Sequence, residues 1–183
     1  MKIAIVGPPG SGKTTFCWGL GFLLKKLGKK VELLPEMIKF EVYKGADFSK
    51  DGFDIRKTLA QRDIEEGVLK SKVHFDYVIC EAPLCNGFFY SLYYKKEEET
   101  EFLKKIAKKY ISTYDVILRM PIGKKEDYQS FGRNESFEET MLLDQLITSE
   151  INKLKYKGKI ITIKDRNDVM GVIGLLSDIK GVS

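Results

Sequence analysis

The sequence predicts an α/β fold built on a five-stranded parallel sheet with helices on both faces. Short apolar runs alternate along the chain with segments of helical periodicity, and this alternation is typical of a parallel sheet with helical crossovers. Each run is continuously apolar rather than alternating, as in strands that are buried on both faces. The expected strands are Lys2–Val6, Val31–Leu34, Tyr77–Cys80, Val116–Leu118 and Lys159–Ile163.

Helical patterns lie between and after these runs. The first expected helix covers about Lys13–Leu27 and ends at Gly28, a residue common just after helix ends. Ser136 and Glu139 form a capping-box pattern that predicts the start of another helix. Further helices are expected around residues 55–68, 102–110 and 169–176. Residues 40–52 and 121–134 show no clear period, and we expect a short lid over about residues 120–136.

Length and composition place the chain among globular proteins. Its 183 residues fit one domain, residues 1–183, and 43% hydrophobic with 31% charged residues argues against disorder. No apolar run is long enough to cross a membrane, and no signal peptide is evident, so we expect a cytoplasmic protein with no membrane partner. Three cysteines without metal-site spacing and a single histidine, His74, argue against zinc sites and Ser-His-Asp hydrolysis.

The strongest motif is Gly7-Pro8-Pro9-Gly10-Ser11-Gly12-Lys13-Thr14. It matches G-x-x-x-x-G-K-[ST], and it has the strand before it and the helix after it that a P-loop requires. Glycines let backbone amides approach phosphate oxygens, and the helix N-terminus favours negative charge. The motif predicts a P-loop NTPase fold that binds ATP and Mg²⁺. Nucleotide contacts are expected from Pro9, Gly10, Ser11, Gly12, Lys13, Thr14 and Thr15, with Thr14 also a Mg²⁺ ligand.

Three classes of P-loop protein are candidates for this chain. A signalling GTPase needs an Asn-Lys-x-Asp motif, and Thr162-Ile163-Lys164-Asp165 does not have that order. Large ring-forming ATPases are normally longer and carry a second helical domain. A small-molecule kinase fits the chain length, the expected lid and the polar residues after the strands.

Two carboxylates follow expected strands at the edge where ligands of parallel sheets bind. Glu36 follows the second strand, where it can accept a proton from an attacking hydroxyl. Glu81 follows the third strand, where it can hold Mg²⁺ or contact the acceptor. We therefore expect Glu36 to be catalytic, Glu36 and Glu81 to contact substrate, and Glu81 to help bind the metal.

Arginines around the lid are candidates to neutralise charge during phosphoryl transfer. Arg119 leaves the fourth strand at the ligand edge, and Arg133 lies just before the capped helix. With Lys13 and Glu36 they complete the expected catalytic set. In the acceptor pocket we expect Phe40 to stack on a base, Gln61 to bond its edge and Arg62 to pair with an acceptor phosphate.

These residues resemble the deoxyribonucleoside kinases. Pro35-Glu36 is similar to their Pro-Glu step, whose glutamate is the catalytic base, and Gln61 resembles their base-reading glutamine. Glu81 lies in a segment similar to their Glu-Arg-Ser site, although Ala82 stands in place of the arginine. Ribosylnicotinamide kinases and phage-type nucleotide kinases share the Pro-Glu and lid pattern. The resemblance also implies that Arg166 borders the adenine.

The predicted function is therefore transfer of the γ-phosphate of ATP to a nucleoside or nucleotide. The lysines around residues 95–109 are interleaved with glutamates, which is typical of a solvated helix face. A kinase acting on a nucleic-acid hydroxyl is an alternative, with the net charge of +5 as its support. An ATP-operated binding switch without an acceptor is a second alternative, and the oligomeric state is left open.

Overall fold

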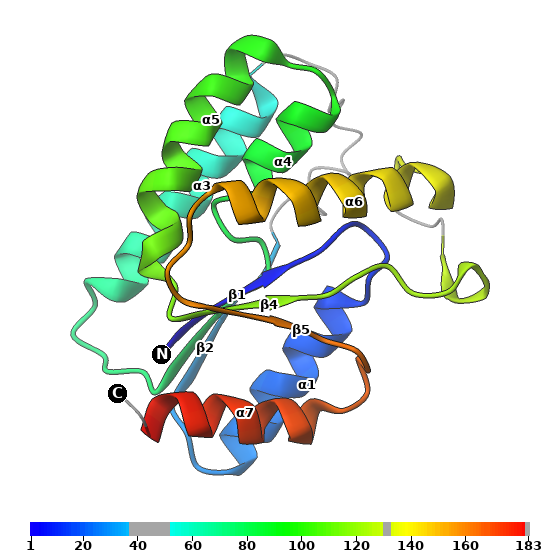
Figure 1. The fold of residues 1–183 in the computed structure, drawn as a ribbon. Helices are drawn as coiled ribbons and strands as arrows, with labels where there is room; N and C mark the ends of the chain where they lie inside the picture. The colour runs from blue at the N-terminus through cyan, green and yellow to red at the C-terminus, as the bar shows by residue number, and fades with distance from the viewer. Residues whose placement is uncertain (37–51, 130–132, 182–183) are drawn as a thin grey trace.

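The structure, a computed structural model, describes residues 1–36, 52–129 and 133–181. The predicted base-stacking residue Phe40 therefore lies outside the described residues. The chain alternates strands and helices from its first residues to its last helix (Figure 1). The strands are β1 (Lys2–Val6), β2 (Val31–Leu34), β3 (Tyr77–Cys80), β4 (Val116–Arg119) and β5 (Lys159–Thr162). The helices are α1 (Lys13–Lys26), α3 (Phe53–Leu69), α4 (Asn86–Tyr93), α5 (Glu97–Tyr110), α6 (Phe137–Lys153) and α7 (Val169–Gly181).

All five strands belong to one parallel sheet in the order β2-β3-β1-β4-β5. The predicted α/β fold with a five-stranded parallel sheet is therefore confirmed. Two strand ends differ from the prediction, since β4 extends to Arg119 and β5 stops at Thr162. Because β1 lies at the centre of the sheet, the loop that follows it opens at the middle of the carboxyl edge.

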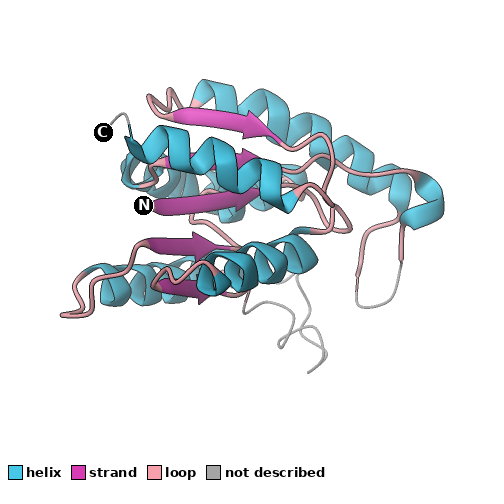
Figure 2. Ribbon diagram, turned by 90° about the horizontal axis from the view of Figure 1, so that it is seen from below, coloured by secondary structure: helices cyan, strands magenta, loops and turns pink. Residues whose placement is uncertain are grey.

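Helices cover both faces of the sheet (Figures 1 and 2). Side chains on β1 alternate between two cores, as the period of a strand requires. Ile3 and Ile5 belong to the core that α1 and α7 close. Ala4 and Val6 belong to the core that α4, α5 and α6 close. This double burial explains why the strands are continuously apolar.

The helix prediction missed one element. Residues 86–93 form α4, which we did not predict, and α5 begins at Glu97, ahead of the predicted 102–110 segment. The predicted capping box is present at the start of α6: the Ser136 hydroxyl accepts from the Glu139 amide at 3.2 Å, and the Glu139 carboxylate accepts from the Ser136 amide at 2.7 Å. The start of α6 is therefore well defined.

The expected lid region lies between β4 and α6. Its described part contains one short 3-10 helix, η2 (Lys125–Asp127), and is otherwise irregular, while residues 130–132 lie outside the description. It follows the carboxyl end of β4, beside the loop after β1, at the right of Figure 1. Within the described ranges, no helix has both the length and the apolar character needed to cross a membrane.

Candidate active site

The loop between β1 and α1 has the backbone that its glycines allow. A Cβ on Gly7 would lie 2.1 Å from the carbonyl oxygen of Met120, so no larger residue fits against the end of β4. Gly10 has a φ of 76°, a left-handed conformation that disfavours residues with a side chain. The Ser11 hydroxyl donates to the carbonyl of Pro8 at 2.9 Å and holds the turn closed. The loop is therefore compact.

Lys13 lies over this loop. Its Nζ donates to the carbonyl oxygens of Gly7 and Pro8, both at 2.8 Å, and the residue is buried. An ammonium group inside a ring of backbone atoms is positioned to meet a phosphate that enters the loop. Of the other predicted nucleotide contacts, Pro9 is half-buried at the loop and Thr15 is exposed on α1.

Glu81 joins the phosphate loop to the end of β2. One carboxylate oxygen accepts from the Thr14 hydroxyl, and the other accepts from the backbone amide of Glu36 at 3.3 Å. Glu81 is only 2% exposed, because it follows β3 between two neighbouring strands. The structure therefore brings together three of the residues that the sequence predicted.

Thr14 and Glu81 also fit the predicted metal ion. Both offer oxygen atoms, and Mg²⁺ is bound by a few protein oxygens together with water and substrate phosphates. Among the residues that the structure describes, no group of three or more His, Cys, Asp or Glu side chains has metal-site geometry. A site that a nucleotide phosphate completes suits this pair better than an all-protein zinc or calcium site.

Tyr90 of α4 lies within electrostatic range of Glu36. Burial and the nearby carboxylates of Glu36 and Glu135 raise the pKa of Tyr90 well above its usual value. A phenol is already protonated at neutral pH, and this shift extends that state to higher pH, so Tyr90 can act as a donor. Glu135, which precedes α6, in turn accepts a hydrogen bond from the Tyr94 hydroxyl. The side of α4 that carries Tyr90 and Tyr94 is thus near the carboxylates of Glu36 and Glu135.

Asn86, at the start of α4, is a second candidate that sequence reasoning missed. It is 4% exposed, and its side-chain Oδ1 has no hydrogen-bond partner within the described part of the chain. A buried carbonyl oxygen without a donor is unfavourable, and a ligand hydroxyl or amine would satisfy it. Asn86 follows Glu81 by five residues, and a polar residue in an otherwise apolar segment after a ligand-edge strand was the available signal.

Arg119, Arg133 and Arg166, three of the four predicted site arginines, occupy different positions. Arg133 lies next to the phosphate loop, with its Cζ 3.5 Å from the Cβ position of Gly10. Arg166 lies over Gly12, where a Cβ would be 3.2 Å from its Cδ, and its guanidinium donates to Asp127 at 2.7 Å.

Arg119 turns toward α6 instead. Its Nη2 donates to Asp144 at 2.8 Å and to the Thr148 hydroxyl at 2.5 Å. The structure therefore places Arg133 and Arg166 at the loop and pairs Arg119 with α6. A direct role for Arg119 in phosphoryl transfer stays a prediction.

The two predicted acceptor residues on α3, Gln61 and Arg62, point in different directions from the helix. Gln61 is buried and donates weakly to Glu65, at 3.4 Å. Arg62 is partly exposed and pairs with its neighbour Asp63 at 2.7 Å. Arg62 thus pairs within its own helix, whereas Gln61 points into the interior, and the predicted roles of both stay predictions.

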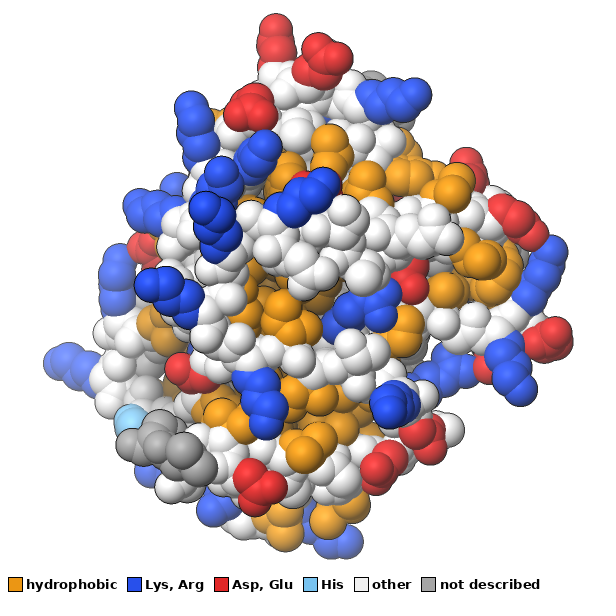
Figure 3. All heavy atoms as spheres, in the orientation of Figure 1, with side chains coloured by type: hydrophobic (Ala, Val, Ile, Leu, Met, Phe, Trp, Pro, Cys, Tyr) orange, Lys and Arg blue, Asp and Glu red, His pale blue; other side chains and the backbone are white. Residues whose placement is uncertain are grey.

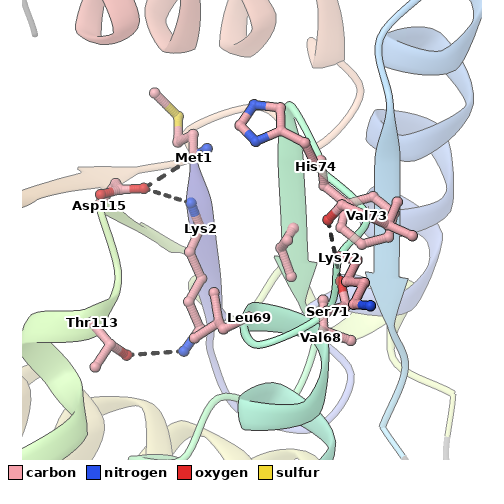
Figure 4. A pocket seen from close by; sticks show the side chains of 12 residues that line it. Met1, Lys2, Val68, Leu69, Ser71, Lys72, Val73, His74, Thr113 and Asp115 are labelled. Atoms are coloured by element: carbon pink, nitrogen blue, oxygen red, sulfur yellow. Dashed lines mark hydrogen bonds and ion pairs between the residues drawn. The ribbon is translucent and has the colours of Figure 1, made fainter.

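A separate cavity lies at the opposite, amino edge of the sheet (Figure 4). It measures about 480 Å³ and opens between the starts of β1 and β3 and the segment before β4. The Lys2 ammonium at its wall already pairs with Glu65 at 2.8 Å and donates to Thr113 at 2.9 Å. This cavity is distinct from the site around the phosphate loop.

The fold and this loop define a P-loop protein of the α/β class. A protein-family model described as an AAA domain matches residues 2–168, and the chain belongs to this family.

Solved kinase structures share the fold. Deoxyadenosine kinase from M. mycoides, with the products dCMP and a flexible dCDP bound, is 18% identical, covers 100% of both chains and has a TM-score of 0.64. NadR in complex with NAD and AMP-PNP is 19% identical, with a TM-score of 0.70, over 100% of this chain and 50% of NadR. The present chain therefore spans about half the length of NadR. At these identities the likeness concerns the fold, and it matches the group that the sequence resembles.

Proposed function

We propose that this protein is a Mg²⁺-dependent phosphotransferase that moves the γ-phosphate of ATP to a hydroxyl or phosphate of a nucleoside or nucleotide. The observation that carries the proposal is the Glu81 bridge. It links the Thr14 hydroxyl of the phosphate loop to the backbone amide of Glu36, which supports a role for Glu36 beside the bound phosphates. The fold shared with deoxyadenosine kinase and NadR supports the same reading.

The reaction follows from the roles of these residues. Lys13 and the loop amides bind the phosphates, while Glu36 accepts the proton of the attacking hydroxyl. A bond forms between that oxygen and the γ-phosphorus, and the bond to the oxygen bridging the β- and γ-phosphates breaks, so that ADP leaves. When bound, Mg²⁺ would neutralise phosphate charge, with Thr14 and Glu81 as its protein-side partners.

The acceptor would lie between Glu36 and the side of α4 that carries Tyr90. Tyr90 supplies a protonated phenol there, and Asn86 supplies a buried oxygen without a partner. A nucleoside offers both ring hydroxyls and base amines to such groups. Gln61 and Arg62 stay candidates for contacts to the base and to an acceptor phosphate.

The proposal is tested by transfer of label from [γ-³²P]ATP to a panel of nucleosides, nucleoside monophosphates and oligonucleotides. We expect a labelled small-molecule product that depends on Mg²⁺. Glu36→Gln should lower turnover by at least about 100-fold, the lower range of a general base. Glu32→Gln, on the strand β2 that precedes Glu36 but away from its carboxyl end, is the matched control and should retain turnover.

The same panel separates the two alternatives. A nucleic-acid kinase would label oligonucleotides, with a steep dependence on salt. The described charges favour a small acceptor, since α5 has glutamates in its first turn and lysines in its last turn rather than a continuous basic track. Figure 3 shows this mixture as red groups at the top of the molecule and blue groups along its left side. A binding switch would release phosphate at a rate that no acceptor changes.

A further inference from the structure

Tyr128, which follows η2, packs directly on the phosphate loop. A Cβ built on Gly10 would lie 2.7 Å from Cε2 and 2.8 Å from Cδ2 of the Tyr128 ring. Distances this short mean that the ring touches the loop backbone at a point where only glycine leaves room. An aromatic residue from the segment after β4 is therefore part of the surface around the expected phosphate position.

The start of α6 holds this ring in place. The Tyr128 hydroxyl donates to the backbone carbonyl of Glu135 at 2.5 Å and lies 3.3 Å from the hydroxyl of Thr140, which is fully buried. The ring also meets Phe137 edge-on, with a centroid separation of 5.6 Å. Because the capping box at Ser136 defines this end of α6, the ring has a fixed support.

Two ion pairs add weaker support from the surface. Asp127 pairs with Arg166 at 2.7 Å, and Lys125 pairs with Glu138 at 2.6 Å. Both pairs are largely exposed, and exposed pairs contribute little to stability. The packing and the hydroxyl contacts of Tyr128 therefore determine its position more than these charges do.

Arg133 stacks on this ring and retains a donor without a partner. Its Cζ lies 5.0 Å from the ring centroid, within the range of a cation–π interaction. Its Nη1 is buried and has no hydrogen-bond partner among the residues that the structure describes. A buried guanidinium nitrogen without an acceptor is unfavourable, and a phosphate oxygen is a strong acceptor for it.

We propose that Tyr128 is a positioning residue that holds the Arg133 guanidinium at Gly10, so that the Nη1 donor of Arg133 faces the phosphates of ATP. The expected effect of Tyr128 on turnover rests on the proposed function, whereas its effect on nucleotide binding can be measured without an acceptor. A donor that is already oriented loses less entropy on binding and stabilises the charge that develops during transfer. Tyr128 thus acts through Arg133 rather than on the substrate itself.

A double-mutant cycle on nucleotide binding tests the inference. The affinity for AMP-PNP with Mg²⁺ is measured by isothermal titration calorimetry for Tyr128→Leu, Arg133→Met and the double variant. We expect Tyr128→Leu to weaken binding about 2- to 30-fold, the range of a cation–π contact. The double variant should bind within about twofold of Arg133→Met alone. Losses that multiply in the double variant would show that Tyr128 acts independently of Arg133.

Two further variants separate positioning from support of the fold. Tyr128→Phe keeps the ring and removes the hydroxyl, so we expect it to bind AMP-PNP within about threefold of the parent. Tyr110, at the end of α5, donates to Glu66 of α3 at 2.6 Å, away from the phosphate loop. Tyr110→Leu should therefore leave the affinity for AMP-PNP unchanged. If Tyr128→Phe were as weak as Tyr128→Leu, the ring would not be the positioning element.

Turnover supplies a second readout. With an acceptor identified, Tyr128→Leu and Arg133→Met should both lower kcat while the KM for that acceptor changes little. If no acceptor is found, the proposed function fails while the binding cycle still decides the role of Tyr128. A fall in acceptor affinity without a fall in kcat would contradict positioning of Arg133.

Discussion

Replacing Gly10 with alanine tests the packing of the phosphate loop most sharply. The new Cβ would lie 2.7 Å from the Tyr128 ring, whereas carbon atoms in contact are about 3.5–4.0 Å apart. The ring must therefore move by nearly 1 Å, and Arg133, stacked on it, must move as well. The φ of 76° adds backbone strain of about 1–2 kcal/mol for any residue with a side chain.

Gly28→Ala provides the matched control. Gly28 has a φ of 75°, so alanine meets the same strain, but no atom of the described residues lies within 4 Å of its Cβ position. Both variants should lower the melting temperature by about 2–8 °C, because 1 kcal/mol corresponds to about 2–4 °C at this size. Only the strain is shared, so any further difference between the two variants reports the contact with Tyr128.

Nucleotide binding should separate the two variants. Loss of one charge-assisted hydrogen bond is worth about 1.5–3 kcal/mol. Gly10→Ala should therefore weaken ATP binding about 10- to 150-fold, whereas Gly28→Ala should bind like the parent. Calorimetric titration with ATP and Mg²⁺ measures both affinities. Equal affinities in the two variants would refute the contact between Tyr128, Arg133 and the loop as a determinant of binding.

Three further predictions concern stability. Glu65→Gln leaves the buried Lys2 ammonium without its carboxylate partner and should lower the free energy of unfolding by about 3–5 kcal/mol in urea titrations; an unchanged midpoint would contradict this role. Burial raises the pKa of Cys85 to about 12, so the unfolded chain loses this proton first and stability should fall as pH rises from about 9 to 12. Cys85→Ala should make that fall shallower by up to about 1.4 kcal/mol per pH unit, and an identical slope would refute the assignment. Ser136→Ala removes the α6 cap and should lower the melting temperature by about 2–4 °C by circular dichroism.

Most of the sheet could be predicted from the sequence because its strands are buried on both faces. Continuous apolar runs then mark each strand, and the glycine-rich motif marks the turn after β1. Helix α4 could not be predicted in this way. It is rich in aromatic residues, contains Gly87 near its start and has most of its residues buried, so no polar face gives it a helical period.

Side-chain directions at the site were less predictable than backbone positions. Arg119 ends β4 at the expected edge, yet it turns to Asp144, which lies 25 residues further along the chain. No sequence motif marks Tyr128, because its position depends on contacts with Gly10 and with the start of α6. Such contacts join segments distant in sequence, and a single sequence does not encode them as a local pattern.

Transfer of the γ-phosphate is the most direct test of the central claim. The parent protein and Glu36→Gln are incubated with [γ-³²P]ATP, Mg²⁺ and the panel of nucleosides and monophosphates, and products are separated by thin-layer chromatography. We predict a labelled nucleotide product with the parent and at least about 100-fold less with Glu36→Gln at unchanged ATP affinity. Release of free phosphate alone, with no labelled acceptor in the panel, would contradict the phosphotransferase assignment.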